Sequence, residues 1–122
     1  MATLKKMINI SGKTLMSGQE SSVTLFPSKE KGIRFFVRGS QQPIEAIPSN
    51  VISTDNCVVL GNTKSQIMLV EHFMAACAFA GIDSLDVSVA SSEMPVFDGS
   101  SLKWYEQFVL TGIEEEEIKK GL

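Results

Sequence analysis

The sequence predicts an α+β fold, a two-layer sandwich in which a mixed or antiparallel sheet carries two helices on one face. The first half of the 122 residues contains short apolar runs separated by Gly, Pro and Asn, a pattern typical of strands. The second half contains two segments with apolar residues at helical spacing, and an alternating strand between them. Strands followed by helix–strand–helix favour a sheet that both helices cover on the same side.

The strands of the first half can be placed by the residues that interrupt them. The run from Met7 to Ile10 ends at the Ser11-Gly12 pair, and the alternating segment 21–26 ends at Pro27. Gly32 precedes an apolar run over 33–37, and Ser17-Gly18 indicates a turn or loop. Two further short strands are expected over 44–47 and 57–60.

A helix is expected over 66–80, because Leu69, Phe73, Ala76 and Ala80 recur at helical spacing. Gly81 is suited to end it in a left-handed conformation, since glycine has no Cβ. Alternation of apolar and polar residues over 85–89 then predicts a strand.

A second helix is expected after the turn at 95–99, with Ser100 or Ser101 as its N-cap. Its apolar residues Trp104 and Phe108 are four apart and therefore share a face. The charged tail from Glu114 to Glu117 is consistent with a short solvated helix.

Composition limits the function classes. The net charge of −3, with Lys and Arg scattered, gives no basic stripe, so we expect no nucleic-acid partner. The sequence after Met1 has no long apolar stretch of the kind found in secretory signals, and no run approaches the roughly 20 apolar residues that span a bilayer. Cys57 and Cys77 lie in apolar runs and are interpreted as buried free thiols rather than a disulfide. A cytoplasmic location is therefore expected.

Glu71 and His72 form the one concentrated chemical signal. His72 is the only histidine, and on a helix the two neighbours point about 100° apart, so they cannot form an i, i+4 ligand pair. A zinc site needs three or four protein ligands, and the sequence has no His-x-x-x-His or Cys-x-x-Cys. On residue type alone, His72 is either a hydrogen-bonded structural histidine or a metal ligand. Asp98-Gly99-Ser100 is a turn followed by a helix cap on the same grounds.

Four segments, in this order and spacing, carry a resemblance to a known family. They are Leu15-Met16-Ser17-Gly18, Val70-Glu71-His72-Phe73-Met74-Ala75-Ala76, Gly81-Ile82-Asp83 and Glu93-Met94-Pro95-Val96-Phe97-Asp98-Gly99-Ser100. Together they make the sequence similar to the N-terminal domain of the zinc-dependent UDP-3-O-acyl-N-acetylglucosamine deacetylases of lipid A biosynthesis. The resemblance extends along nearly the whole chain.

The resemblance implies roles for the two site residues. His72 corresponds to one ligand of Zn²⁺, and Glu71 to the general base of an amide hydrolysis whose substrate is a UDP-linked, acylated amino sugar. In that family two domains of similar fold pack helix layer against helix layer, and the second domain supplies a His and an Asp as further ligands. Residues 1–122 correspond to the first domain alone, the second being absent from this sequence. Met16 stands where the family has a histidine.

Two functions follow as hypotheses. The chain is a half-length deacetylase homologue that hydrolyses an acetamide only when a partner supplies the missing zinc ligands; alternatively, it is a non-catalytic binding, regulatory or scaffold domain with the same fold. A single chain is expected to be inactive by itself, and it can also be a piece of a longer protein. Both hypotheses expect an exposed apolar face over 66–80 and 100–110, covered in a homodimer or by a chain equivalent to the second domain.

Overall fold

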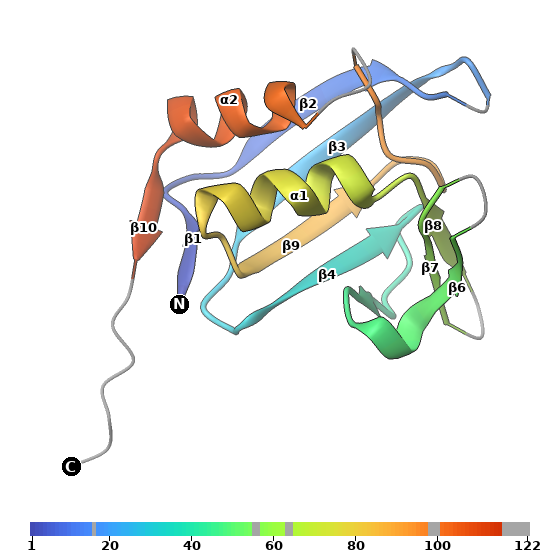
Figure 1. Cartoon of the computed structure of the whole chain (residues 1–122), viewed down its shortest axis with the longest axis horizontal. Helices are drawn as coiled ribbons and strands as arrows, with labels where there is room; N and C mark the ends of the chain where they lie inside the picture. Colours follow the sequence, from blue (N-terminus) through green and yellow to red (C-terminus); the bar gives the residue numbers. More distant parts are fainter. Residues whose placement is uncertain (16, 55–56, 63–64, 98–100, 116–122) are drawn as a thin grey trace.

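A computed structural model describes residues 1–15, 17–54, 57–62, 65–97 and 101–115. Within these residues the largest sheet has five strands in the order β2-β3-β9-β4-β5, and both α-helices lie across one face of it (Figure 1). This arrangement confirms the predicted α+β sandwich. The elements are β2 (Ile8–Lys13), β3 (Glu20–Pro27), β4 (Gly32–Val37), β5 (Ile44–Glu45), α1 (Glu71–Ala80), β9 (Ser84–Val89) and α2 (Leu102–Thr111).

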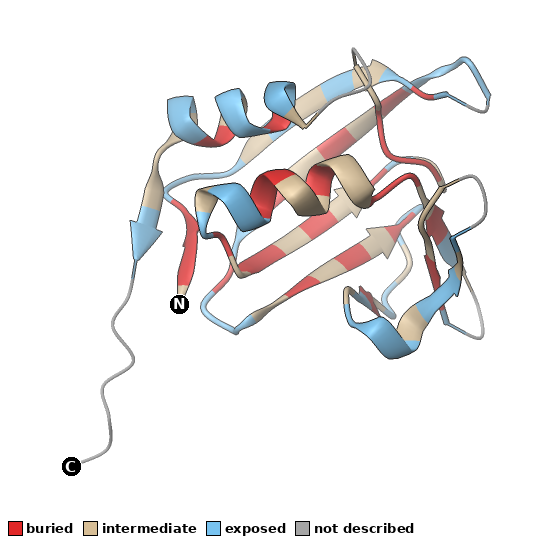
Figure 2. Cartoon of the chain, viewed as in Figure 1, coloured by how far each residue is buried: buried red, intermediate tan, exposed pale blue. Residues whose placement is uncertain are grey.

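The central strand is β9, which pairs antiparallel with β3 and parallel with β4. Val87 lies opposite Leu25 on one side and Phe35 on the other. Because alternate residues of a strand point to opposite faces, one face is apolar and is buried beneath the helices, as the alternating colours of Figure 2 show. The buried apolar residues of these three strands are Val23, Leu25, Ile33, Phe35, Val37, Leu85, Val87 and Val89.

Two smaller sheets complete the described structure. The ends of the described chain meet where β1 (Ala2–Leu4) pairs antiparallel with β10 (Ile113–Glu115). A three-stranded sheet lies beside the end of β4 and follows a short 3-10 helix over Pro48–Asn50 (Figure 1). Its strands are β6 (Val51–Ser53), β7 (Val59–Gly61) and β8 (Gln66–Met68).

An aromatic cluster joins the helices to the sheet. The Phe73 ring of α1 makes edge-to-face contacts with Trp104 and Phe108 of α2 and with Phe35 of β4, at centroid distances of 5.0, 5.8 and 5.8 Å. All four side chains are fully buried. Such contacts add to the free energy of area burial, so this cluster fixes the position of α1 and α2 over the sheet.

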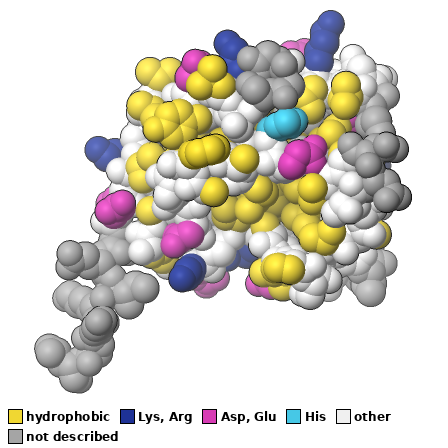
Figure 3. All heavy atoms as spheres, viewed as in Figure 1, with side chains coloured by type: hydrophobic (Ala, Val, Ile, Leu, Met, Phe, Trp, Pro, Cys, Tyr) yellow, Lys and Arg dark blue, Asp and Glu magenta, His cyan; other side chains and the backbone are white. Residues whose placement is uncertain are grey.

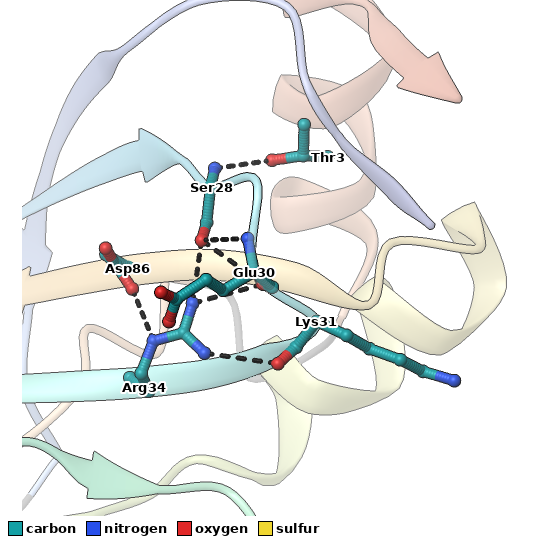
Figure 4. Close-up of polar contacts among 6 residues, drawn as sticks. All are labelled: Thr3, Ser28, Glu30, Lys31, Arg34 and Asp86. Atoms are coloured by element: carbon teal, nitrogen blue, oxygen red, sulfur yellow. Dashed lines mark hydrogen bonds and ion pairs between the residues drawn. The ribbon is translucent and has the colours of Figure 1, made fainter. Parts of the chain in front are cut away.

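On the opposite face of the sheet, a polar network fastens the β3–β4 connection (Figure 4). Arg34 Nε donates to Asp86 Oδ1 at 2.7 Å, which ties β4 to the central strand. Arg34 Nη2 also donates to Ser28 Oγ at 2.8 Å, and Nη1 donates to the Lys31 carbonyl at 3.3 Å. The Ser28 amide in turn donates to Thr3 Oγ1 at 3.1 Å, so the network reaches β1.

The predicted helix over 66–80 is wrong in its first turn. Gln66–Met68 is strand β8, which pairs antiparallel with β7, and the helix begins only at Glu71. The apolar residues at 67–70 fit either structure, and pairing with β7 decides between them. The end of the helix is confirmed, since Gly81 has φ +73° and its amide donates to the Cys77 and Ala78 carbonyls.

Three other expectations also need correction. Gly12 does not end its strand but lies within β2. Glu114 and Glu115 belong to β10 rather than to a helix, because they pair with β1. Ser101 precedes α2 as expected, but its side chain makes no capping hydrogen bond.

Other parts of the sequence predictions fall outside the described residues or are confirmed. Met16, the turn at 98–100 and the tail beyond 115 lie outside the description. Both cysteines are free; Cys77 is buried and Cys57 is half-buried. In the described part of the chain, no helix has the length and apolar character needed to cross a membrane.

Candidate functional site

The path into α1 is set by one left-handed residue. Leu69 links β8 to α1 with φ +63°, a conformation uncommon for residues other than glycine. Its amide donates to the Val58 carbonyl at 3.0 Å, and its side chain is buried. Burial of the side chain and pairing with the segment before β7 therefore hold the strained backbone, which turns the chain from the small sheet into the helix.

Glu71, the first residue of α1, is fixed by a backbone donor. Its Oε2 accepts a hydrogen bond of 2.6 Å from the Val58 amide, thirteen residues earlier in the chain. A hydrogen bond to a charged group is stronger than one between neutral groups, and the positive end of the helix dipole also favours a carboxylate here. The half-buried side chain is thus held in one orientation, and Oε1 makes no hydrogen bond with the described part of the chain.

His72 follows Glu71 and is half-buried. It makes no hydrogen bond or ion pair with the described part of the chain. Residues three and seven positions further on share its side of the helix, so His72 lies on the outward face with Ala75 and Phe79. Its imidazole is therefore free to bind a group that approaches this face.

A complete metal centre is not assembled by the described residues. None of their His, Cys, Asp and Glu side chains form a group of three or more that could hold an ion. The donor set at the start of α1 is one oriented carboxylate and one imidazole that has no partner among the described residues. That set fits one zinc ligand and one base, and a catalytic zinc site needs further protein ligands.

The outward surface of the helices is apolar. Phe79 and Leu110 are each 79% exposed, and Figure 3 shows hydrophobic side chains gathered over this side of the molecule, where the single histidine also reaches the surface. Two shallow cavities of about 420 and 290 Å³ indent it, and they share Leu102 and Tyr105. We call this surface the apolar helix face, formed by Phe79, Leu102, Tyr105, Val109 and Leu110.

The structure also brings together two of the segments noted in the sequence. Glu93 is only 4% exposed, and its Oε1 accepts a hydrogen bond of 3.3 Å from the Ser17 amide in the β2–β3 connection. The segment after Glu93 packs against Gly12, where an added Cβ would lie 2.7 Å from the Phe97 ring. The Phe97 ring in turn contacts Trp104 edge to face at 5.0 Å. These contacts link the β2–β3 connection to the core beneath α2.

Two features of the site were not expected from the sequence. The donor to Glu71 is the backbone of Val58, and a backbone amide carries no signal in residue type. The left-handed conformation of Leu69 was also missed, because leucine is uncommon in that region.

Comparison with known proteins identifies the family. The model of the LpxC family, described as UDP-3-O-acyl N-acetylglycosamine deacetylase, matches residues 1–122. The chain belongs to this deacetylase family.

Curated members of the deacetylase family show the same relationship. The chain is 34% identical over 119 residues to UDP-3-O-acyl-N-acetylglucosamine deacetylase of Campylobacter hominis, and 34% identical over 121 residues to that of Campylobacter jejuni. The enzyme of the same name from Brucella melitensis is 31% identical over 121 residues. These matches cover 97–98% of this chain but only 40–42% of each relative.

Proposed function

We propose that this chain provides part of a zinc-dependent deacetylase centre, in which Glu71 is the general base and His72 is one zinc ligand. The substrate would be a UDP-linked, acylated N-acetylglucosamine, as named for the relatives, and the reaction would be hydrolysis of its acetamide. The observation that carries the proposal is the pairing of an oriented carboxylate with an unpaired imidazole at the start of α1.

The roles suit the two side chains. Neutral imidazole is a good zinc ligand, and His72 has no described partner that would compete. Zinc supplies Lewis acidity, which activates water for attack on an amide carbonyl. Glu71 Oε2 is occupied by the Val58 amide, so Oε1 is the atom that would accept the proton from water. Adjacent helical positions let His72 bind the metal and leave Glu71 free for proton transfer.

We further propose that the remaining ligands come from a polypeptide equivalent to the part of the relatives that this chain does not match. That part is more than half of each relative, so it is long enough to form a second domain. The apolar helix face is the proposed docking surface, because exposed apolar patches of this kind mark interaction sites. His72 lies on the outward side of α1 with Phe79, so a partner seated there would also reach the imidazole.

The test is reconstitution. The chain is mixed with a polypeptide that comprises the unmatched part of the Campylobacter hominis relative, and zinc binding and acetate release from UDP-3-O-acyl-N-acetylglucosamine are measured. We expect zinc binding and acetate release in the mixture, and loss of both with His72→Ala. Glu71→Gln should keep zinc while slowing kcat by about 10²- to 10⁴-fold. Ser11→Ala, at an exposed position of β2, is the matched control and should change neither.

Other outcomes would contradict the proposal in distinct ways. A mixed complex that binds no zinc through His72 would favour the non-catalytic binding or scaffold alternative. A chain that dimerises by light scattering, and binds zinc through His72 without the second polypeptide, would show instead that a second copy covers the apolar helix face. If the chain stays monomeric and does not bind the added polypeptide, the proposed docking surface is wrong.

A further inference from the structure

A polar cavity lies away from the apolar helix face, where the end of β4 meets the small sheet. Its volume is about 420 Å³. Gln66, the first residue of β8, lines the cavity. The other end of β8 leads to α1 and the candidate site. The lining residues are Val37, Arg38, Ser40, Ser65, Gln66 and Ser92.

The lining is rich in hydrogen-bond donors, and the described residues that form it include no carboxylate. Arg38 brings five N–H donors and a permanent positive charge, and it forms no ion pair within the described part of the chain. Gln66 adds an amide, and Ser65 and Ser92 add hydroxyls. The nearest acidic residue in sequence, Glu93, instead directs Oε1 to the Ser17 amide. The cavity therefore favours an anion.

A tight turn and one buried hydroxyl shape the cavity. Arg38 has φ +52° and the following Gly39 has φ +74°, so they occupy the centre of a tight turn that normally takes Asn or Gly at the first position. The Arg38 amide donates to the Val89 carbonyl at 2.9 Å, which holds the turn against the central strand. Ser65 Oγ is buried and forms no hydrogen bond with the described residues, and native proteins rarely leave such an atom unpaired.

We propose that this cavity binds a phosphate-class oxyanion. Arg38 provides the charged contact, and Ser65, Ser92 and Gln66 provide neutral donors to the remaining oxygens. Guanidinium groups match the geometry of phosphate oxygens. Ser65 Oγ, which is buried as its side chain lies in this structure, would gain its missing partner by turning toward the oxyanion. The cavity is larger than an inorganic phosphate requires, so it can also accept an organic group attached to the phosphate. This site does not depend on the proposed deacetylase function.

The test is a titration of the chain with inorganic phosphate at constant ionic strength, followed by amide chemical shifts and by the melting temperature. We expect saturable shifts at residues 38–40, 65–66 and 92, together with a rise in melting temperature. Arg38→Gln should weaken binding by at least about tenfold. Lys103→Gln on α2 removes the same charge from an exposed position and should leave the affinity unchanged. Equal losses in both variants would overturn the site in favour of nonspecific charge screening.

Ser65→Ala gives an independent check, because its expected effects on the melting temperature and on phosphate affinity have opposite signs. It removes a buried unpaired hydroxyl, so it should raise the melting temperature without phosphate while weakening phosphate binding. A variant that changes neither property would overturn the role of Ser65. UDP and glycerol 3-phosphate distinguish a nucleotide from a lipid headgroup as the natural source, by which of them binds more tightly than inorganic phosphate. Absence of saturation with all three at tens of millimolar overturns the proposal.

Discussion

Glu71 Oε2 lies 2.6 Å from the amide nitrogen of Val58, and this one hydrogen bond joins the first turn of α1 to the small sheet. A loop residue and a helix residue thirteen positions apart therefore share a single polar contact at the candidate site. The position of the carboxylate depends on the small sheet as much as on the helix that carries it.

Substitutions at Glu71 should separate its structural contact from its charge. Glu71→Ala leaves the partly buried Val58 amide without an acceptor, so we expect a loss of about 1–3 kcal/mol in the free energy of unfolding. Glu71→Gln keeps an acceptor oxygen and should cost less than about 1 kcal/mol. Urea unfolding at neutral pH measures both. Equal losses for the two variants would show that the Val58 hydrogen bond does not contribute as described.

Gly12→Ala should disturb the core below α2. The new Cβ would lie 2.7 Å from the Phe97 ring and 3.1 Å from Pro95 Cβ, so the Phe97 ring must shift and its contact with Trp104 must change. Overpacking of this kind typically costs about 1–3 kcal/mol. Near-ultraviolet circular dichroism detects the changed surroundings of Trp104, and urea unfolding measures the loss in the free energy of unfolding. Ser11→Ala, at the exposed neighbouring position, is the control; a change of the same size there would rule out the ring contact as the cause.

Asp83 should make the free energy of unfolding depend on pH in the acidic range. Burial alone would raise the pKa of Asp83, but hydrogen bonds from the Ala2 amide and the Ser84 hydroxyl, with the positive N-terminus and Lys31, hold it below its usual value. A lowered pKa in the folded state means that the ionised group stabilises the fold above its unfolded pKa, and that this stabilisation is lost as the pH falls through the folded pKa.

Asp83→Asn can still accept the Ala2 hydrogen bond but carries no charge. The difference in unfolding free energy between wild type and Asp83→Asn should therefore be largest at neutral pH and shrink as the pH falls below about 4. Urea unfolding across this range measures it. A difference that stays constant with pH would mean that the charge of Asp83 has no part in stability.

The two thiols should differ in reactivity. Burial raises the pKa of Cys77 and excludes reagents from it, whereas Cys57 is half-buried. In the native chain, iodoacetamide should modify Cys57 first and Cys77 only on unfolding. Mass spectrometry of timed samples follows both reactions, and Cys57→Ser should leave a protein that reacts slowly. Rapid modification of Cys77 in that variant would contradict its burial.

Much of the fold could be predicted because its pattern is local. Alternation over 85–89 and the glycine at 81 predict β9 and the end of α1, and both are confirmed. The start of α1 could not be placed, because 66–70 is apolar enough for a strand or a helix. Hydrogen bonds between β7 and β8 and the left-handed turn at Leu69 decide it, and these depend on residues distant in sequence.

The candidate site was predictable only in part for a similar reason. Glu71 and His72 could be found as an unusual adjacent pair, and family resemblance gave them roles. Their surroundings depend on tertiary contacts: a backbone amide at Val58 orients the carboxylate, and the outward side of α1 exposes the imidazole beside an apolar surface. Residue type does not encode a backbone donor or the side of a helix that stays uncovered.

The central place of β9 also affects how the chain can fold during synthesis. Its parallel partner β4 lies 52 residues upstream, as the Arg34–Asp86 contact illustrates. Until Ser84–Val89 leaves the ribosome, the facing edges of β3 and β4 have no strand between them and remain open to pairing with other chains. A nascent chain halted before Ser84 is therefore expected to lack a protease-resistant core, and one that reaches the end of α2 to acquire it.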